Sequence, residues 1–358
     1  MRAALAVFTL LLFFEAPAQY RFASLDSLLR KNNATLSGTG GGWTTILVKD
    51  GTILYRHSEG NFNADKPVSI ASASKWYAGV LIMRLVDEGA LSLNDKVSRY
   101  IPSFNTPEKK EITLKQCFAL TSGFAGSSEP LDEAMEGSRK QTYAAMVDEI
   151  AQMPLVAKPG AQVNYGGLAM QVAGRVAEIA TGRSWNDLFD EKVVKPLGLE
   201  RTWCLGKKTG GVPRIAGGVV STASDYLKLL EMLSQKGLYK GKRILSERAV
   251  NILLSDQTGT ATIGYSPFTK YKRTLNTPTD PRYGIGNWVI QIEHVDVNTS
   301  PGAFGFTPWI DRRHGYYGVI AVRSAFPKVM PVFWEALRLV DEELEAKSKM
   351  PGGPGIVK

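Results

Sequence analysis

The chain has 358 residues, of which 44% are hydrophobic and 22% are charged, as in soluble globular proteins with a sizeable core. These proportions exclude a disordered chain, a collagen-like fibre and a polytopic membrane protein. The 43 Lys and Arg residues outnumber the 34 Asp and Glu residues and give a net charge of +9. Because the basic residues form scattered doublets rather than a stripe, we expect no nucleic-acid partner.

The first 18 residues have the pattern of a secretory signal peptide. Arg2 is followed by an apolar run at 3–14 and by a small-x-small sequence at 16–18, directly before Gln19. The apolar run is too short to cross a bilayer, which takes about 20 residues, so no transmembrane segment is predicted. We therefore expect a periplasmic or secreted protein.

The next segments predict a helix and a hairpin. Apolar residues at helical spacing indicate a helix over 22–32. Two runs of strand-forming residues, 43–49 and 52–56, are separated only by Asp50-Gly51, a strong hairpin signal.

The middle of the chain is predicted to be helical, and its last part is predicted to contain strands and a helix. Helices are predicted at 72–88, 168–180 and 224–235, each followed by a glycine. Strand character returns later, and a helix with an apolar face follows it; the expected elements are strands at 283–292, 303–310 and 316–322 and a helix at 329–347.

These elements predict an α+β fold, with an antiparallel sheet flanked by N- and C-terminal helices and an inserted, mainly helical lobe. A single domain is expected over 19–350, followed by a disordered Pro/Gly-rich tail at 351–358. Within this domain, the α/β lobe is expected from about 20–71 and 282–348 and the helical lobe from about 72–281.

Ser72 and Lys75 form the sharpest chemical motif of the chain, at the start of the helix predicted over 72–88. Residues three apart on a helix share a face. A serine hydroxyl needs a nearby base to become a nucleophile, and a buried lysine can provide one when its pKa is depressed. Taken alone, the motif is equally compatible with a serine N-cap beside a solvated lysine.

Tyr165 stands on a glycine-flanked turn before the helix predicted over 168–180. Near Lys75, its hydroxyl would relay a proton to a leaving group. In isolation, the segment would favour a half-buried tyrosine bonded to backbone.

A third segment runs from Asn298 to Gly305 and leads into a predicted strand. Pro301 is tolerated only where its missing N–H faces a free edge, so we expect an edge strand that lines the site. Gly302 would let a substrate approach the backbone closely, and the Ala303 N–H would join that of Ser72 in an oxyanion hole. The alternative is an ordinary turn before a strand.

Together these segments resemble the serine β-lactamase and penicillin-binding-protein superfamily, especially the class C-related branch with its family VIII esterases and D-aminopeptidases. Ser72-x-x-Lys75 matches the first motif of that superfamily, Tyr165 its second and Ser300-Pro301-Gly302 the place of its third, and the resemblance covers about residues 24–345. It implies Ser72 as acylated nucleophile, Lys75 as general base and Tyr165 as proton relay, with the N–H groups of Ser72 and Ala303 as oxyanion hole.

The sequence departs from the superfamily pattern at two positions. Gly167 stands where the second motif usually has Asn, whose amide binds an acylamide side chain, and Ser300 replaces the Lys or His that opens the third motif. Both changes affect substrate recognition and leave the acylation residues in place. Efficient β-lactamase or DD-peptidase action is therefore disfavoured.

Histidine and cysteine provide no further predicted site. His57, His294 and His314 form no His-x-x-x-His motif or His/Asp/Glu cluster along the sequence, so no metal site and no cofactor are expected. Cys117 and Cys204 lie in apolar stretches, which favours two buried free thiols over a disulfide.

We therefore expect a serine hydrolase that acts on a small ester or amide. Two alternatives stay open: a β-lactamase or D-amino-acid peptidase whose carboxylate-binding cation is Arg282 or Lys272, and a non-turnover penicillin-binding or sensor protein. The sequence leaves the oligomeric state and the physiological substrate open.

Overall fold

The computed structural model describes residues 20–127, 142–207, 211–270, 281–292 and 295–348. Its largest sheet has seven antiparallel strands in the order β10-β11-β12-β13-β14-β1-β2. The bounds of these strands are β1 (Gly42–Lys49), β2 (Thr52–Gly60), β10 (Arg282–Tyr283), β11 (Trp288–Ile292), β12 (Val295–Thr299), β13 (Thr307–Asp311) and β14 (Tyr316–Val322).

The two ends of the chain meet in this sheet. β1 pairs with β14 in a register that runs from Trp43 opposite Val322 to Lys49 opposite Tyr316. β1 and β2 form the predicted hairpin, in which Asp50 and Gly51 have φ angles of 49° and 74°. These angles are those of the tight hairpin turn that Asp-Gly favours.

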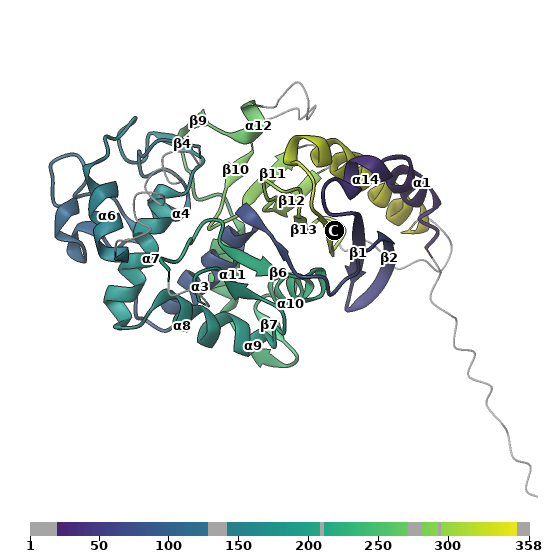
Figure 1. The fold of residues 1–358 in the computed structure, drawn as a ribbon, viewed down its shortest axis with the longest axis horizontal. Helices are drawn as coiled ribbons and strands as arrows, with labels where there is room; N and C mark the ends of the chain where they lie inside the picture. Colours follow the sequence, from purple (N-terminus) through teal and green to yellow (C-terminus); the bar gives the residue numbers. More distant parts are fainter. Residues whose placement is uncertain (1–19, 128–141, 208–210, 271–280, 293–294, 349–358) are drawn as a thin grey trace, which may run out of the picture.

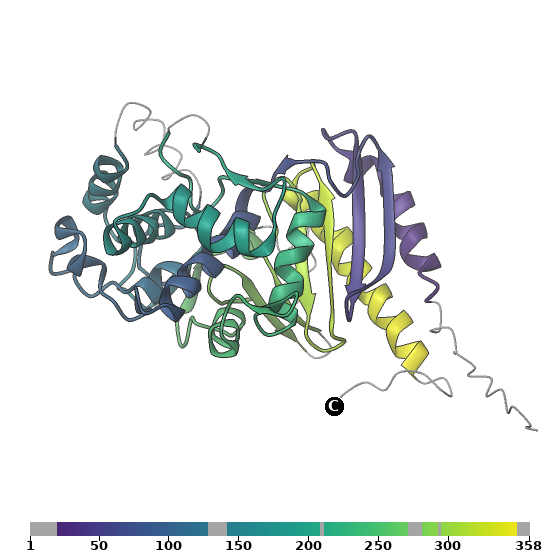
Figure 2. The same ribbon diagram turned by 90° about the horizontal axis from the view of Figure 1, so that it is seen from below.

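Helices cover both faces of the sheet (Figures 1 and 2). The terminal helices α1 (Ala23–Lys31) and α14 (Phe326–Ser348) pack against each other. From α14, Phe333 contacts Trp309 of β13 with ring centroids 5.3 Å apart. On the other face, α10 (Ala223–Ser234) packs against β13 and β14.

In its described residues, the segment between β2 and β10 is mainly helical and has three small sheets. Its strands are β3 (Val68–Ser69), β4 (Gln162–Asn164), β5 (Trp203–Cys204), β6 (Val219–Ser221), β7 (Leu238–Tyr239), β8 (Lys242–Arg243) and β9 (Thr262–Tyr265). The remaining helices are α2 (Asn33–Ser37), before β1, and then α3 (Ser74–Asp87), α4 (Leu114–Phe118), α6 (Tyr143–Gln152), α7 (Leu168–Thr181), α8 (Trp185–Phe189), α9 (Lys195–Leu197), α11 (Glu247–Leu254) and α12 (Pro267–Lys270). The predicted α+β fold with an inserted helical part is confirmed.

Helix α3 is buried on nearly all sides, which is why its sequence is apolar around the whole helix rather than along one stripe. Two glycines allow the backbone before β11 to approach it. A Cβ built on Gly79 would lie 2.2 Å from the Ile285 carbonyl oxygen, and one on Gly286 would lie 2.2 Å from the Lys75 carbonyl oxygen. The first turn of α3 is therefore fixed against the sheet.

The C-terminal strands differ from their predicted bounds. The strand expected over 283–292 is two strands, β10 and β11, because the chain turns between them at Gly286, whose φ is +84°. The strand expected from 303 begins only at Thr307, and β12 was not predicted. Its pattern Val-Asp-Val-Asn-Thr alternates weakly, since Asn298 and Thr299 are buried polar residues with hydrogen-bond partners.

The predicted signal peptide and C-terminal tail lie outside the described residues. Among the helices that the structure does describe, none has the length and apolarity to traverse a bilayer.

Candidate active site

Ser72 lies in a 3-10 turn, η1 (Ala71–Ala73), between β3 and α3. The Ile70 N–H donates to the Val219 carbonyl at 3.1 Å and ties this turn to β6. Ala71 has a φ of 45°, in the left-handed region that residues with a Cβ rarely adopt. The α-helix thus begins at Ser74 rather than at Ser72, and the Ser72 side chain stays only half-buried.

Lys75, in the first turn of α3, is 3% exposed. Its Nζ lies 3.1 Å from Ser72 Oγ and donates to the Ala216 carbonyl at 2.8 Å. Burial, together with the positive charge of Arg214, lowers the pKa of Lys75 to about 7. Within the described part of the chain, no carboxylate lies at ion-pair distance from this amine, so a large fraction of it is neutral at physiological pH.

Tyr165 follows β4 and is fixed by two backbone hydrogen bonds, from its N–H to Tyr265 O at 2.9 Å and from the Ser127 N–H to its own carbonyl at 2.7 Å. Its ring contacts two other groups of the site. Lys75 Nζ is 4.8 Å from the ring centroid, and the Trp288 indole stacks at 4.8 Å with an interplanar angle of 19°. Burial raises the pKa of the Tyr165 phenol to about 12, against hydrogen bonds with Ser72 and Trp288 that lower it.

The structure therefore brings together Ser72, Lys75 and Tyr165, the three residues predicted to carry the chemistry, from η1, α3 and the turn after β4. The arrangement supplies a hydroxyl, a neutral amine within hydrogen-bond distance of it and a phenol in contact with both. This is the set of groups that nucleophilic acyl transfer requires.

Ser300 is hydrogen-bonded to the turn that carries Ser72, η1, which we call the nucleophile turn. It is buried, and its hydroxyl donates to the Ser72 carbonyl at 3.1 Å and, at 3.4 Å, to the Gly286 carbonyl. Its side chain thus contacts protein backbone beside the site.

Gly302 and Ala303 differ from the predicted edge strand. β12 is hydrogen-bonded on both sides, to β11 and β13, and the chain after it forms an exposed turn at Ala303. The expected space above Gly302 is occupied, because a Cβ there would lie 2.2 Å from the Ile70 carbonyl oxygen. This glycine therefore permits close packing against the nucleophile turn rather than approach of a substrate.

The two N–H groups assigned to the oxyanion hole have no acceptor within the described ranges. The Gly302 N–H donates to Phe306 O at 2.8 Å, whereas neither the Ser72 N–H nor the Ala303 N–H has a protein partner there. The pair as an oxyanion hole stays a prediction.

Gly167 is the N-cap of α7, and its carbonyl accepts the Gln171 N–H at 3.0 Å. It offers no side-chain amide to a substrate. Of the two cations considered as substitutes for the third-motif cation, Arg282 binds Asp256 Oδ2 at 3.1 Å and the carbonyls of Ala261 and Gly259, and Lys272 lies outside the described residues.

Sequence reasoning missed three groups at the site: the Ala216 carbonyl, the Trp288 indole and the Arg214 guanidinium. A backbone acceptor carries no residue-type signal. Trp288 lay in a predicted strand, where an aromatic residue is ordinary. Arg214 stands two residues before Ala216, in the loop before β6, and only the fold brings that loop to Lys75.

Cys117 and Cys204 are buried free thiols, as expected. The prediction that no histidine belongs to a His/Asp/Glu cluster is wrong for His314. His314 lies beside Asp311 and Asp341, and one possible ligand atom from each of the three residues lies within 4.8 Å of the other two. Its Nε2 is 3.4 Å from Glu345 Oε1. Hydrogen bonds with the two aspartates raise the pKa of His314 to about 10, so this group is an ion pair at neutral pH.

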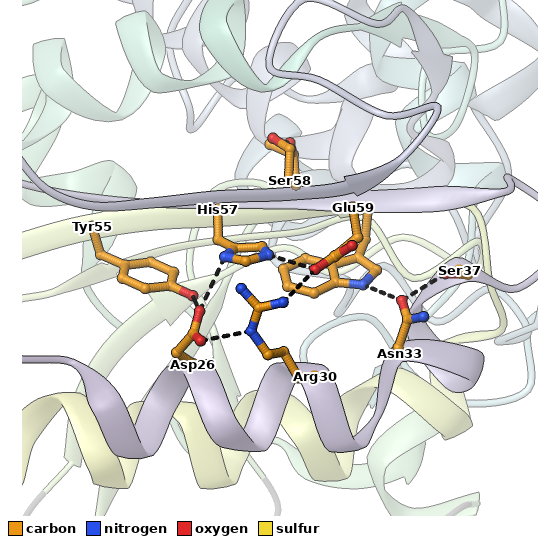
Figure 3. A network of polar contacts seen from close by, with 10 residues as sticks. Asp26, Arg30, Asn33, Ser37, Tyr55, His57, Ser58 and Glu59 are labelled. Atoms are coloured by element: carbon orange, nitrogen blue, oxygen red, sulfur yellow. Dashed lines mark hydrogen bonds and ion pairs between the residues drawn. The ribbon is translucent and has the colours of Figure 1, made fainter.

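His57 lies in a second acid cluster, between α1 and β2 (Figure 3). Its Nδ1 is 3.0 Å from Asp26 and its Nε2 is 2.8 Å from Glu59, and Arg30 contacts both acids. Ser58 points to the opposite side of the strand, toward Thr44 (Figure 3). These residues therefore do not form a Ser-His-Asp triad. His294 lies outside the described residues.

A family model described as Beta-lactamase matches residues 29–341. Penicillin-binding protein 4 of Amycolatopsis lactamdurans is 25% identical over 237 residues, covering 58% of this chain and 61% of that protein. Protein flp of Staphylococcus aureus (strain NCTC 8325 / PS 47) is 29% identical over 175 residues, covering 45% of this chain and 34% of that protein. The chain thus covers less than two thirds of the length of these curated relatives.

Solved structures share the fold over most of the chain. A putative beta-lactamase from Bacteroides dorei DSM 17855 is 29% identical, with a TM-score of 0.75, over 89% of this chain and 98% of that one. EstCE1, described as a hydrolase with promiscuous acyltransferase activity, is 18% identical, with a TM-score of 0.70, over 88% and 98% of the two chains; its likeness concerns the fold alone.

Proposed function

Since the chain belongs to the β-lactamase family of serine hydrolases, we propose that it is a hydrolase that acts through an acyl-enzyme on Ser72, with a small ester or amide as substrate. The observation that carries the proposal is the buried Lys75 amine, 3.1 Å from Ser72 Oγ, without a described carboxylate partner and with its pKa lowered to about 7.

Acylation begins when neutral Lys75 accepts the Ser72 proton as Oγ attacks the substrate carbonyl carbon. One Lys75 N–H is engaged by the Ala216 carbonyl, which orients the amine so that its lone pair is available to the serine. The negative oxygen of the tetrahedral intermediate rests on the N–H groups of Ser72 and Ala303.

The intermediate collapses when the bond to the leaving group breaks. The proton taken by Lys75 passes through Tyr165 to the departing alcohol or amine, and the acyl group stays on Ser72 Oγ. A water molecule then attacks the acyl carbon and gives its proton to the same pair, and the carboxylic acid and free serine result.

Gly167 and Ser300 favour an ester or small-amide substrate. At these positions the family pattern has an amide and a cation that hold the acylamide and carboxylate of β-lactams and peptides. Here one position has no side chain, and the hydroxyl at the other bonds to protein backbone. A β-lactamase or peptidase activity is the second candidate, supported by the 29% identity to the putative beta-lactamase of Bacteroides dorei.

The test is turnover of p-nitrophenyl butyrate and nitrocefin by the wild type, Ser72→Ala and Lys75→Ala. We expect butyrate turnover in the wild type and its loss in both variants, whereas the exposed controls Ser92→Ala and Lys96→Ala keep it. Preference for nitrocefin would favour the second candidate. Retained turnover in Ser72→Ala or Lys75→Ala would contradict the mechanism.

Intact-mass measurement after a fluorophosphonate or a penicillin separates an enzyme from a sensor. We expect the fluorophosphonate adduct on Ser72 and rapid loss of any substrate-derived acyl group. A lasting penicillin adduct without product would indicate the non-turnover alternative.

We also propose export to the periplasm or medium, from the charged start and apolar run at 2–14. The mature protein should begin at Gln19, which N-terminal sequencing of the exported form tests.

A further inference from the structure

Three acids surround His314 at the end of the hairpin that β13 and β14 form. Asp311 is the last residue of β13, His314 lies in the turn that follows it, and Asp341 belongs to α14. Glu345, four residues further along α14, shares the helix face of Asp341. We call these four residues the His314 cluster. The mechanism above uses none of them.

The distances around Nδ1 of His314 fit a metal ion. Nδ1 is 3.4 Å from Asp311 Oδ1 and 3.2 Å from Asp341 Oδ1, whereas charge-assisted N–H···O bonds are about 2.7–2.9 Å long. In a tetrahedral zinc site with bonds of about 2.0–2.2 Å, two ligand atoms lie about 3.3–3.6 Å apart. The imidazole and the two carboxylates are therefore spaced as the ligands of a metal ion are.

The other ring nitrogen of His314 supports the same reading. The side chain is only 2% exposed, and among the described residues its Nε2 has no hydrogen-bond partner. Glu345 Oε1 lies 3.4 Å from this nitrogen. A histidine that binds a metal through one nitrogen commonly donates the N–H of the other to a carboxylate. Glu345 lies where that carboxylate is needed.

Neighbouring groups already hold the two aspartates in place. The His314 backbone N–H donates to Asp311 Oδ1 at 2.7 Å, and the Tyr316 hydroxyl donates to Asp341 Oδ1 at 3.2 Å. A carboxylate has enough lone pairs to accept such a bond and also to bind a metal. The Asp341 side chain is 17% exposed, which gives an ion access from the solvent.

The group around His57 also has a histidine and two acids, but it lacks this arrangement (Figure 3). Asp26 and Glu59 lie at opposite ring nitrogens, at 3.0 and 2.8 Å, and Arg30 contacts both acids. The two carboxylates therefore do not meet at one nitrogen, and a cation already bridges them. His57 provides a matched control.

We propose that Asp311, His314 and Asp341 bind one divalent transition-metal ion of the zinc type, with Glu345 as hydrogen-bond acceptor behind the histidine. His314 binds through Nδ1, and the proton that this nitrogen carries in the metal-free protein passes to the solvent. One imidazole with two carboxylates suits Zn²⁺ better than Mg²⁺ or Ca²⁺, which prefer oxygen ligands throughout.

The position of the site indicates a structural ion. Asp311 pairs with Val297 in β12, whereas Ser300, which bonds to the Ser72 carbonyl, follows the other end of β12. The ion would therefore fix α14 to the β13–β14 turn without entering the acyl-transfer reaction.

The experiment titrates ZnCl₂ into the purified full chain, without a polyhistidine tag and after removal of metal by a chelator. Competition with a chromogenic zinc chelator gives the affinity. In the wild type we expect one ion per chain, with Kd in the micromolar range or tighter. The unfolding temperature should rise by about 3 °C or more at free zinc about a hundredfold above Kd, and MgCl₂ or CaCl₂ should cause no such rise.

Variants of the cluster locate the ion. His314→Gln and Asp341→Asn should each weaken zinc binding by about a hundredfold or more, and Glu345→Gln by about tenfold. His57→Gln should bind zinc as the wild type does. Co²⁺ in the wild type should show the intense visible absorption of a four-coordinate ion, and His314→Gln should lose it.

Absence of saturable zinc binding in the wild type, or binding that both His314→Gln and Asp341→Asn retain, would overturn the inference. Loss of binding in His57→Gln would also overturn it, because the ion would then belong to the other group. If neither ligand variant folds, Glu345→Gln and the cobalt spectrum of the wild type decide.

Discussion

Two polar clusters of this molecule contain basic groups of the kind that enzymes use, and they differ in how those groups are paired. Around His57, two carboxylates and an arginine satisfy one another (Figure 3). Around Lys75, the described partners are a hydroxyl, a carbonyl and an aromatic ring. The first arrangement stabilises a charged base and the second disfavours one. Among the described residues, the candidate site is therefore distinguished by a base that has no acid beside it.

The largest expected effect comes from removing the Lys75 amine, which pairs with no carboxylate in the part of the chain that the structure describes. Lys75→Met should lower kcat/KM more than about 10³-fold because the serine loses its base. The variant should unfold at an equal or higher temperature, since a buried amine without an acid is costly and methionine is not. Ester kinetics and thermal unfolding test both parts. A clear loss of stability would mean that Lys75 is paired after all.

The pH dependence of the wild type gives the next effect. Lys75 must be neutral to act, and its pKa is lowered to about 7. kcat/KM for a neutral ester should therefore fall about tenfold per pH unit below that pKa and level off above it. A limb that stays at the ordinary pKa of lysine, well above neutral, would show that the amine is solvated or ion-paired.

Trp288 tests the aromatic part of the site. Trp288→Leu removes the ring stacked on Tyr165 and a hydrogen bond to its hydroxyl. We expect kcat to fall about tenfold with little change in KM, because Tyr165 is held less well for proton transfer. Trp288→Phe keeps a stacking ring and should recover part of kcat. Equal losses of kcat in both variants would show that stacking on Tyr165 is not the cause of the loss.

The His314 cluster is expected to affect stability and not turnover. Asp311 and Asp341 raise the pKa of His314 from 6.5 to about 10. Its contribution to the free energy of unfolding is therefore complete below pH 6.5 and is lost as the pH rises to about 10. His314→Gln should cost about 2 kcal/mol at pH 6 and remove this pH dependence, with kcat/KM unchanged. Urea unfolding across pH measures it.

The smallest effect is expected at the rim of the His57 cluster. The Arg30 side chain is 56% exposed, and exposed ion pairs contribute little. Arg30→Gln should shift the urea midpoint by no more than the reproducibility of the measurement, and ester turnover should not change. A large shift would show that the two acids around His57 depend on this arginine.

The sequence was informative where function or turn chemistry restricts residue types. Ser72, Lys75 and Tyr165 were predicted because their order along the chain resembles that of the motifs of a known superfamily, since each of them alone also has an ordinary structural explanation. The Asp50-Gly51 hairpin was predicted because its left-handed backbone favours those two residues. The fold class followed from the alternation of apolar spacing along the chain.

The sequence-based predictions were wrong where contacts between residues far apart in the chain determine the structure. Gly302 faces the Ile70 backbone rather than a substrate, and β12 is an interior strand whose buried polar residues hid its pattern. The acids around His314 come from β13 and α14, which are adjacent only after folding. The local sequence around each of these residues does not indicate which distant residues will lie beside it.

The pairing of β1 with β14 has a consequence for biosynthesis. A ribosome has made nearly the whole polypeptide before Trp43 can meet Val322, so the strand synthesised first waits longest for its neighbour. A premature stop codon before β14 would leave β1 and β13 with open edges, and such fragments are prone to aggregate or to be degraded.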